Sequence, residues 1–86
     1  MQEEKKHSRD IVGKTIVSKS GKKFGSVGDL VFETRTGELI YLLLHTPTPF
    51  ADSLNLEKSR EGDLMIPFSS VISSGDFVIV SEEDIV

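Results

Sequence analysis

The sequence contains no cysteine and no tryptophan, and aromatic residues make up only 7% of its 86 residues. Without cysteine the chain has neither disulfides nor thiolate metal sites, two devices that commonly stabilise small domains. A chain of this length forms one domain and buries only about 60% of the surface that its unfolded form exposes. We therefore expect self-association to supply part of the missing stability.

Long hydrophobic runs and an excess of positive charge are also missing. The longest apolar run covers residues 39–44, whereas a membrane-spanning helix needs about 20 apolar residues. Residues 1–9 are charged and lack the apolar region of a signal peptide. The net charge of −4 argues against a nucleic-acid-binding face, which requires clustered Lys and Arg. The sequence predicts a soluble, cytoplasmic protein that neither inserts into a membrane nor binds nucleic acid.

Groups suited to catalysis or metal binding are scarce. His7 and His45 are the only imidazoles, and His7 lies in a polar segment with nothing to hold it. No serine stands in a Gly-x-Ser-x-Gly motif. Asp29, Glu33 and Glu38 are candidate ligands for a divalent cation, but acidic residues beside a hairpin are usually solvated. We predict that the protein is not an enzyme and holds no cofactor or metal.

What the sequence does contain is a set of short β-branched runs separated by glycines, which is typical of a small all-β barrel. Gly21 and Gly37 are expected at the tips of two hairpins, with Gly37 in the left-handed conformation, and Gly28 is expected to bend the strand between them. About six short antiparallel strands are expected, at residues 14–18, 24–33, 38–45, 63–66, 71–74 and 77–80.

Two short motifs lie near the first hairpin. Gly25-Ser26-Val27-Gly28 lacks the Gly-Lys-Ser/Thr ending of a phosphate-binding loop and falls within a strand, so we interpret its glycines as bends. Lys19, Lys22 and Lys23 form a basic cluster, interpreted as a solvated hairpin tip. Contact of these lysines with anionic lipid or a negatively charged partner is the alternative.

The connection formed by residues 46–62 is too long for a hairpin loop. Within it, residues 51–58 predict about two turns of helix with Asp52 or Ser53 as the N-cap. The expected organisation is a flexible lead-in, a barrel domain and an acidic C-terminal tail, at residues 1–9, 10–80 and 81–86. We interpret the tail as a solvated terminus, with a docking peptide or a helical cap as the alternative.

The third expected strand is apolar on both faces. Leu39, Tyr41 and Leu43 alternate with Ile40, Leu42 and Leu44, so one of these two sets is left over once the barrel core is filled. Such a surplus face must meet the long connection, another layer or a second subunit. The candidate protein interface therefore comprises Leu39, Tyr41, Leu43, Phe50, Leu54 and Leu56. In the alternative, the connection folds back and its apolar residues join the core.

Several segments together resemble the PRC-barrel family over residues 8–80. They are Ser8-Arg9-Asp10-Ile11-Val12-Gly13-Lys14, Gly21-Lys22-Lys23-Phe24-Gly25-Ser26-Val27-Gly28-Asp29-Leu30-Val31-Phe32, Thr36-Gly37-Glu38-Leu39, Ile66-Pro67-Phe68-Ser69-Ser70-Val71 and Gly75-Asp76-Phe77-Val78-Ile79-Val80. The family includes the cytoplasmic domain of the photosynthetic reaction-centre H subunit and the C-terminal domain of the ribosome maturation factor RimM. The resemblance implies a small β-barrel without catalytic residues.

The chain shows neither the transmembrane helix of a reaction-centre subunit nor the preceding barrel of RimM, and it is similar to free-standing archaeal proteins of the CdpB type. This resemblance implies a non-enzymatic adaptor in FtsZ-based archaeal cell division, located at the division site and acting with a SepF-like anchor. It also implies a homodimer, or a heterodimer with a paralogous PRC-barrel protein. The kinship to RimM implies an alternative, an accessory factor for ribosome or RNA maturation.

Overall fold

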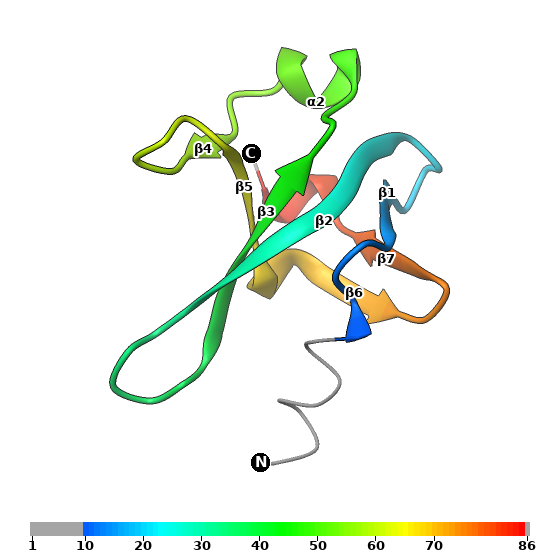
Figure 1. Ribbon diagram of the computed structural model, residues 1–86. Coiled ribbons are helices and arrows are strands. Elements are labelled where there is room, and N and C mark those ends of the chain that lie inside the picture. The colour runs from blue at the N-terminus through cyan, green and yellow to red at the C-terminus, as the bar shows by residue number, and fades with distance from the viewer. Residues whose placement is uncertain (1–9, 86) are drawn as a thin grey trace.

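The computed structural model describes residues 10–85, in which seven strands form one sheet in the order β4-β5-β3-β2-β1-β7-β6 (Figure 1). The strands are β1 (Thr15–Ser18), β2 (Lys23–Phe32), β3 (Leu39–His45), β4 (Glu57–Lys58), β5 (Leu64–Pro67), β6 (Val71–Ser74) and β7 (Phe77–Val80). The chain is thus mostly β, as the sequence predicts. The expected lead-in at residues 1–9, with His7, lies outside the described residues, as does Val86.

The three-stranded meander β1-β2-β3 confirms both predicted hairpins. Gly21 and Gly37 adopt positive φ angles of 92° and 75° in the two turns, a conformation that favours glycine. The second turn is closed by the Glu33 amide, which donates to the Glu38 carbonyl at 2.7 Å. Within β2 the pairing with β3 shifts between Val27 and Asp29, which confirms Gly28 as the bend.

The expectation that all strands pair antiparallel is wrong for β1 and β7. These two strands pair in parallel, from Thr15 opposite Phe77 to Ser18 opposite Val80. Parallel neighbours need a long crossover, and here it consists of everything between the two strands, from β2 to β6. The first and last strands are thereby held side by side, between β2 and β6.

Residues 46–62 fold into a short helix, α2 (Pro49–Ser53), and the two-residue strand β4, which pairs with β5. The N-cap of α2 is Thr48, so the prediction of Asp52 or Ser53 as the cap is wrong. The Thr48 hydroxyl accepts a hydrogen bond from the Ala51 amide at 3.2 Å and donates to the Lys23 carbonyl at 2.6 Å.

The helix is also shorter than predicted and starts earlier. Pro49 at its first position has the fixed φ angle that favours a helix start and needs no hydrogen-bond acceptor. Leu54 is already extended, with φ −87° and ψ 154°. The next residues run toward β4, whose pairing with β5 replaces the second helical turn expected at residues 54–58.

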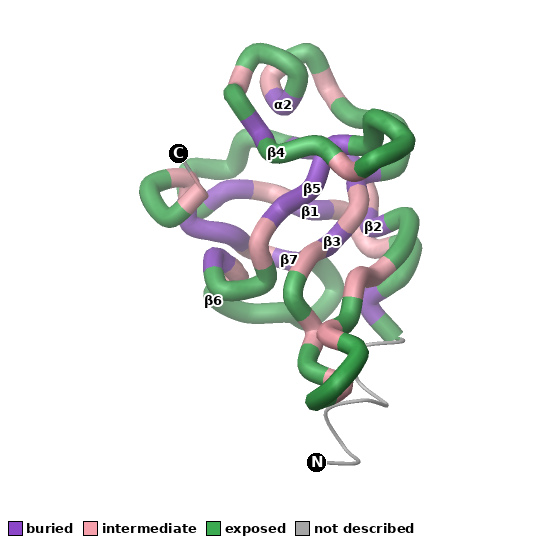
Figure 2. The backbone as a smooth tube through the Cα atoms, turned by 90° about the vertical axis from the view of Figure 1, so that its left-hand side faces the viewer, coloured by how far each residue is buried: buried purple, intermediate pink, exposed green. Residues whose placement is uncertain are grey.

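The core lies inside the curved sheet, closed at one end by α2 (Figures 1 and 2). Phe24 and Phe50 meet edge to face, with ring centroids 5.3 Å apart, and attach the helix to β2. Other fully buried side chains come from β1, β2, β3, β5 and β7, namely Ile16, Val27, Leu42, Ile66, Val78 and Val80. The tip of the β2–β3 hairpin extends away from this core and is exposed at Thr34, Arg35 and Thr36 (Figure 2).

The chain beyond residue 80 packs against the barrel. Ser81 is buried, and its amide donates to the Ser70 carbonyl at 2.9 Å. A 3₁₀ turn, η2 (Glu82–Asp84), follows, and Ile85 then packs against the core. Among the described residues, no helix has the length and apolar character needed to cross a membrane.

Candidate protein-binding groove

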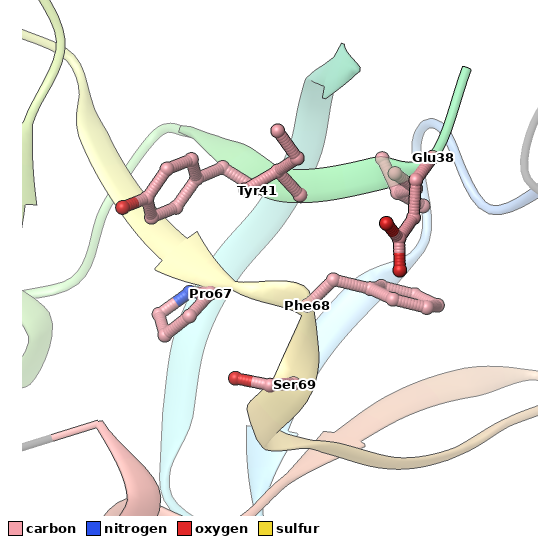
Figure 3. A pocket seen from close by; sticks show the side chains of 7 residues that line it. Glu38, Tyr41, Pro67, Phe68 and Ser69 are labelled. Carbon is pink, nitrogen blue, oxygen red and sulfur yellow. The ribbon is translucent and has the colours of Figure 1, made fainter. Parts of the chain in front are cut away.

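An open groove of about 380 Å³ lies between β3 and the turn that follows β5 (Figure 3). Its lining comes from two segments, Glu38, Leu39, Ile40 and Tyr41 on one side and Pro67, Phe68 and Ser69 on the other. Figure 3 shows Tyr41 and Pro67 at one end, and Glu38 above the ring of Phe68 at the other. The groove is therefore mostly apolar, with a carboxylate at one end and a phenol at the other.

The groove exists because β5 ends before β3 does. Antiparallel pairing between them runs from Leu43 opposite Met65 to Tyr41 opposite Pro67. Pro67 has no amide to continue the ladder, and the chain turns away into the 3₁₀ turn η1 (Phe68–Ser70). Within residues 10–85, no strand pairs with this edge of β3 beside Leu39 and Ile40.

The η1 side of the groove is held in place by hydrogen bonds around the buried Ser70. The Ser70 hydroxyl donates to the Pro67 carbonyl at 2.7 Å, and the Ser70 carbonyl accepts from Ser81. The Val71 amide closes the turn on the Phe68 carbonyl. Because Ser70 is itself buried, these bonds are shielded from water, and Phe68 projects from a fixed backbone.

A shift in strand register exposes Ile40. Val31 lies opposite Tyr41, but the next residue, Phe32, lies opposite Leu39, so Ile40 is the extra residue of a β-bulge. The strict alternation expected for this strand is therefore wrong at its first residues. Leu39 packs against the core, whereas Ile40 has 37% of its surface exposed, as has Phe68.

The polar groups at the two ends of the groove differ in their contacts. The Tyr41 hydroxyl donates to the Glu57 carboxylate at 2.9 Å, which ties β3 to the edge strand β4. This hydrogen bond raises the pKa of Tyr41, and partial burial and the negative charge of Glu57 add to the rise. At the other end, the Glu38 amide is bonded to the Thr36 hydroxyl at 3.1 Å, while its carboxylate points into the groove (Figure 3).

The six residues predicted as a protein interface do not form one surface. Leu39 and Tyr41 line the groove, and Leu43 is half-buried on the outer face of the sheet. Phe50 and Leu54 are half-buried and pack against the core. Leu56 is only 7% exposed and belongs to the core, as in the alternative in which the long connection folds back.

Sequence reasoning missed Ile40, Pro67 and Phe68 as parts of this surface. Strict alternation assigned Ile40 to the face of the buried Leu42, and nothing in the sequence reveals the bulge. Phe68 carried a usable signal, because a large aromatic residue directly after a strand-ending proline lies where the chain leaves the sheet. Phe32 was missed as well and is 41% exposed beside Leu39.

The other motifs considered from the sequence have structural roles or lie apart. In residues 10–85 no three His, Cys, Asp or Glu side chains are grouped as metal ligands would be. Gly25 and Gly28 lie within β2, as predicted. The Lys22 ammonium lies 5.1 Å from the centre of the Phe50 ring, while His45 is exposed at the end of β3.

Comparison with known proteins agrees with this architecture. Residues 3–84 match the model of the PRC-barrel domain, so the match includes β1 to β7 and both walls of the groove. No curated protein shows a significant match to the chain. A match over nearly the full length, together with a curved and mostly antiparallel sheet, shows that the chain belongs to the PRC-barrel family.

Proposed function

We propose that this PRC-barrel protein is a non-enzymatic adaptor of FtsZ-based archaeal cell division, which links divisome components through a SepF-type anchor. It acts in the cytoplasm at the division site, as a homodimer or paired with a paralogous PRC-barrel protein. The division role rests on the resemblance to free-standing PRC barrels of the CdpB type. The role in protein interaction rests on the groove between β3 and η1.

The groove is the observation that carries the interaction role. Ile40 and Phe68 are exposed in a concave site on a chain with 28% charged residues, and exposed apolar side chains grouped in this way are typical of protein-binding sites. Membership of the PRC-barrel family supports the same role, because the resemblance to this family implies no catalytic residues in the chain.

An adaptor must hold two components at once, and the outer face of the sheet offers a second apolar surface. Val31, Tyr41 and Leu43 are half-buried there, and Val31 lies directly opposite Tyr41. We assign self-association to this face and partner binding to the groove. Leu43 belongs to the outer face and does not line the groove, so the two roles are separable by substitution.

Light scattering at high micromolar protein concentration tests self-association. The wild type is expected to dimerise, and Leu43→Glu to weaken the dimer because association would bury an unpaired charge. Ile72→Glu is the matched control, since Ile72 is exposed on β6, away from the outer face of β2 and β3. A monomeric wild type would refute self-association.

Imaging a functional fluorescent fusion together with FtsZ in the native host tests the division role. A mid-cell band that coincides with FtsZ is the expected result. Phe68→Ser is expected to weaken this localisation, and Phe77→Ser, which alters an exposed phenylalanine outside the groove, is expected to preserve it. A diffuse or ribosome-like distribution of the wild type would contradict the division role and favour the maturation-factor alternative.

A further inference from the structure

We propose that the groove binds an extended segment of a partner protein, which pairs with the open edge of β3, packs an apolar side chain against Ile40 and Phe68, and places a Lys or Arg beside Glu38. This inference rests on the proposed adaptor function and specifies what one of its two surfaces recognises. The backbone of β3, the apolar walls and the charge of the groove each support one part of it.

The backbone of β3 supports an extended ligand. Leu39 and Ile40 continue β3 past the end of β5, so that the strand edge facing the groove is unpaired there within residues 10–85. An exposed strand edge beside a groove is the arrangement in which an added peptide strand gains main-chain hydrogen bonds from the sheet. After Pro67 the chain turns away from β3 into η1, so β5 does not continue along this edge.

The walls of the groove support a large apolar side chain in the ligand. Ile40 and Phe68 are each 37% exposed and face one groove from opposite segments. The backbone that carries Phe68 is already fixed by the Ser70 and Val71 hydrogen bonds, so binding would order little of the receptor. A preformed apolar site of this kind favours an anchor residue such as Phe, Leu or Ile.

The charge of the groove selects among possible occupants. The Glu38 carboxylate points into one end, and Glu57 is bonded to Tyr41 at the other. A second copy of this chain would bring its own net charge of −4 to these carboxylates. A partner segment with Lys or Arg on either side of an apolar residue is complementary at both ends.

Titration of ¹⁵N-labelled protein with synthetic heptapeptides, followed by NMR, tests the inference directly. The probes are Gly-Lys-Val-Phe-Val-Lys-Gly, its analogue with both lysines replaced by glutamate, and the lysine peptide N-methylated at both Phe and the Val that follows it, because adjacent amides of an extended strand point to opposite sides. We expect the lysine peptide to bind and to shift the amides of Leu39, Ile40 and Ser69. The glutamate peptide is expected to bind about two- to fivefold more weakly, the range typical of exposed ion pairs.

Variants of the protein and the N-methylated peptide test the apolar contact, the charge preference and the strand pairing separately. Phe68→Ser is expected to weaken the lysine peptide by about tenfold or more, as loss of an anchor contact does, whereas Phe77→Ser leaves binding unchanged. Glu38→Lys is expected to reverse the preference, so that the glutamate peptide binds better than the lysine peptide. The N-methylated peptide, which lacks a main-chain donor for β3, is expected to bind more weakly than its parent peptide.

Several results would overturn the inference. Equal binding of the lysine and glutamate peptides would refute the charge preference, and full affinity of the N-methylated peptide would refute strand pairing. Absence of binding by all three peptides would refute the extended ligand, and a dimer lost in Phe68→Ser would then identify a second copy as the occupant. Localisation of the wild type with FtsZ is measured independently, so failure of the peptide inference is distinguishable from failure of the division role.

Discussion

Replacing Gly25 with alanine is expected to destabilise the protein by about 2–5 kcal/mol, because it combines two unfavourable effects. Gly25 has a φ angle of +147°, and a Cβ built there would lie 3.0 Å from the carbonyl oxygens of both His45 and Thr46. These contacts are with backbone, which cannot rotate away as the end of a side chain can. The loss compares with a total stability of about 4–13 kcal/mol for a domain of this size.

Two other glycines separate the effects. Gly21 has a φ angle of +92° but open space around its Cβ position, so Gly21→Ala measures the conformational effect alone, about 1–2 kcal/mol. Gly28 has no such φ angle, but its added Cβ would lie 2.9 Å from the Cβ of His45. Gly28→Ala therefore measures steric crowding alone, about 1–3 kcal/mol, less a gain of about 0.4–1 kcal/mol from a less flexible unfolded chain.

Urea unfolding followed by far-ultraviolet circular dichroism gives the free energy of unfolding of each variant. The expected order is that Gly25→Ala destabilises more than either Gly21→Ala or Gly28→Ala. If Gly25→Ala loses no more stability than Gly21→Ala, the close approach of β2 to the His45 and Thr46 carbonyls is not a constraint on the fold.

Three further outcomes are expected. The hydrogen bond to Glu57 raises the pKa of Tyr41 in the folded state, so the stability that this bond contributes is complete below the unfolded pKa of about 10 and is lost as the pH rises through the folded pKa. Melting temperatures from about pH 8 to 11 should therefore fall more for the wild type than for Tyr41→Phe. Alkaline ultraviolet absorbance reports the ionisation of this residue alone, because the chain has one tyrosine. Thr48→Ala should lower the free energy of unfolding in urea by about 1 kcal/mol through loss of the helix cap, and an equal loss in the exposed Ser53→Ala would contradict that role for Thr48. Leu56→Ala should lower it by about 2–5 kcal/mol as a core cavity does, whereas a loss below about 0.5 kcal/mol would indicate a surface position.

The parts of the fold that the sequence predicts are those decided by neighbouring residues. The turns at Gly21 and Gly37 and the bend at Gly28 follow from what glycine permits, and the strands between them follow from β-branched runs. The cap at Thr48 was predictable in principle. Thr48-Pro49 pairs a capping residue with a helix-starting proline, whereas the prediction placed the cap later, at Asp52 or Ser53.

The parts that the sequence does not predict depend on contacts between distant segments. No local pattern distinguishes a parallel from an antiparallel neighbour for β7, since its alternation of Phe77, Val78, Ile79 and Val80 suits either. The two-residue strand β4 has no strand-like sequence and forms only because β5 offers it an edge.

Only some of the residues that line the groove could be predicted, because the others depend on contacts between distant segments. Leu39 and Tyr41 were identified from the surplus of apolar residues in one strand, which is a property of the sequence. Ile40 became exposed through a bulge, and Phe68 lines the same groove because β5 ends at Pro67. The bulge and the end of β5 both depend on how strands pair, and a single sequence does not show which residues pair across strands.

The parallel pairing of β1 with β7 also means that this barrel closes only after β7 has been made. During synthesis the β1-β2-β3 meander leaves the ribosome early and is built from local contacts, which form quickly. The outer edge of β1 stays open until Phe77–Val80 has been made, since β7 is the strand that covers it. Until then the nascent chain presents an unpaired edge, which is a site for misassembly with other chains. We expect a chain that stops before Phe77 to retain its hairpins without closing its barrel.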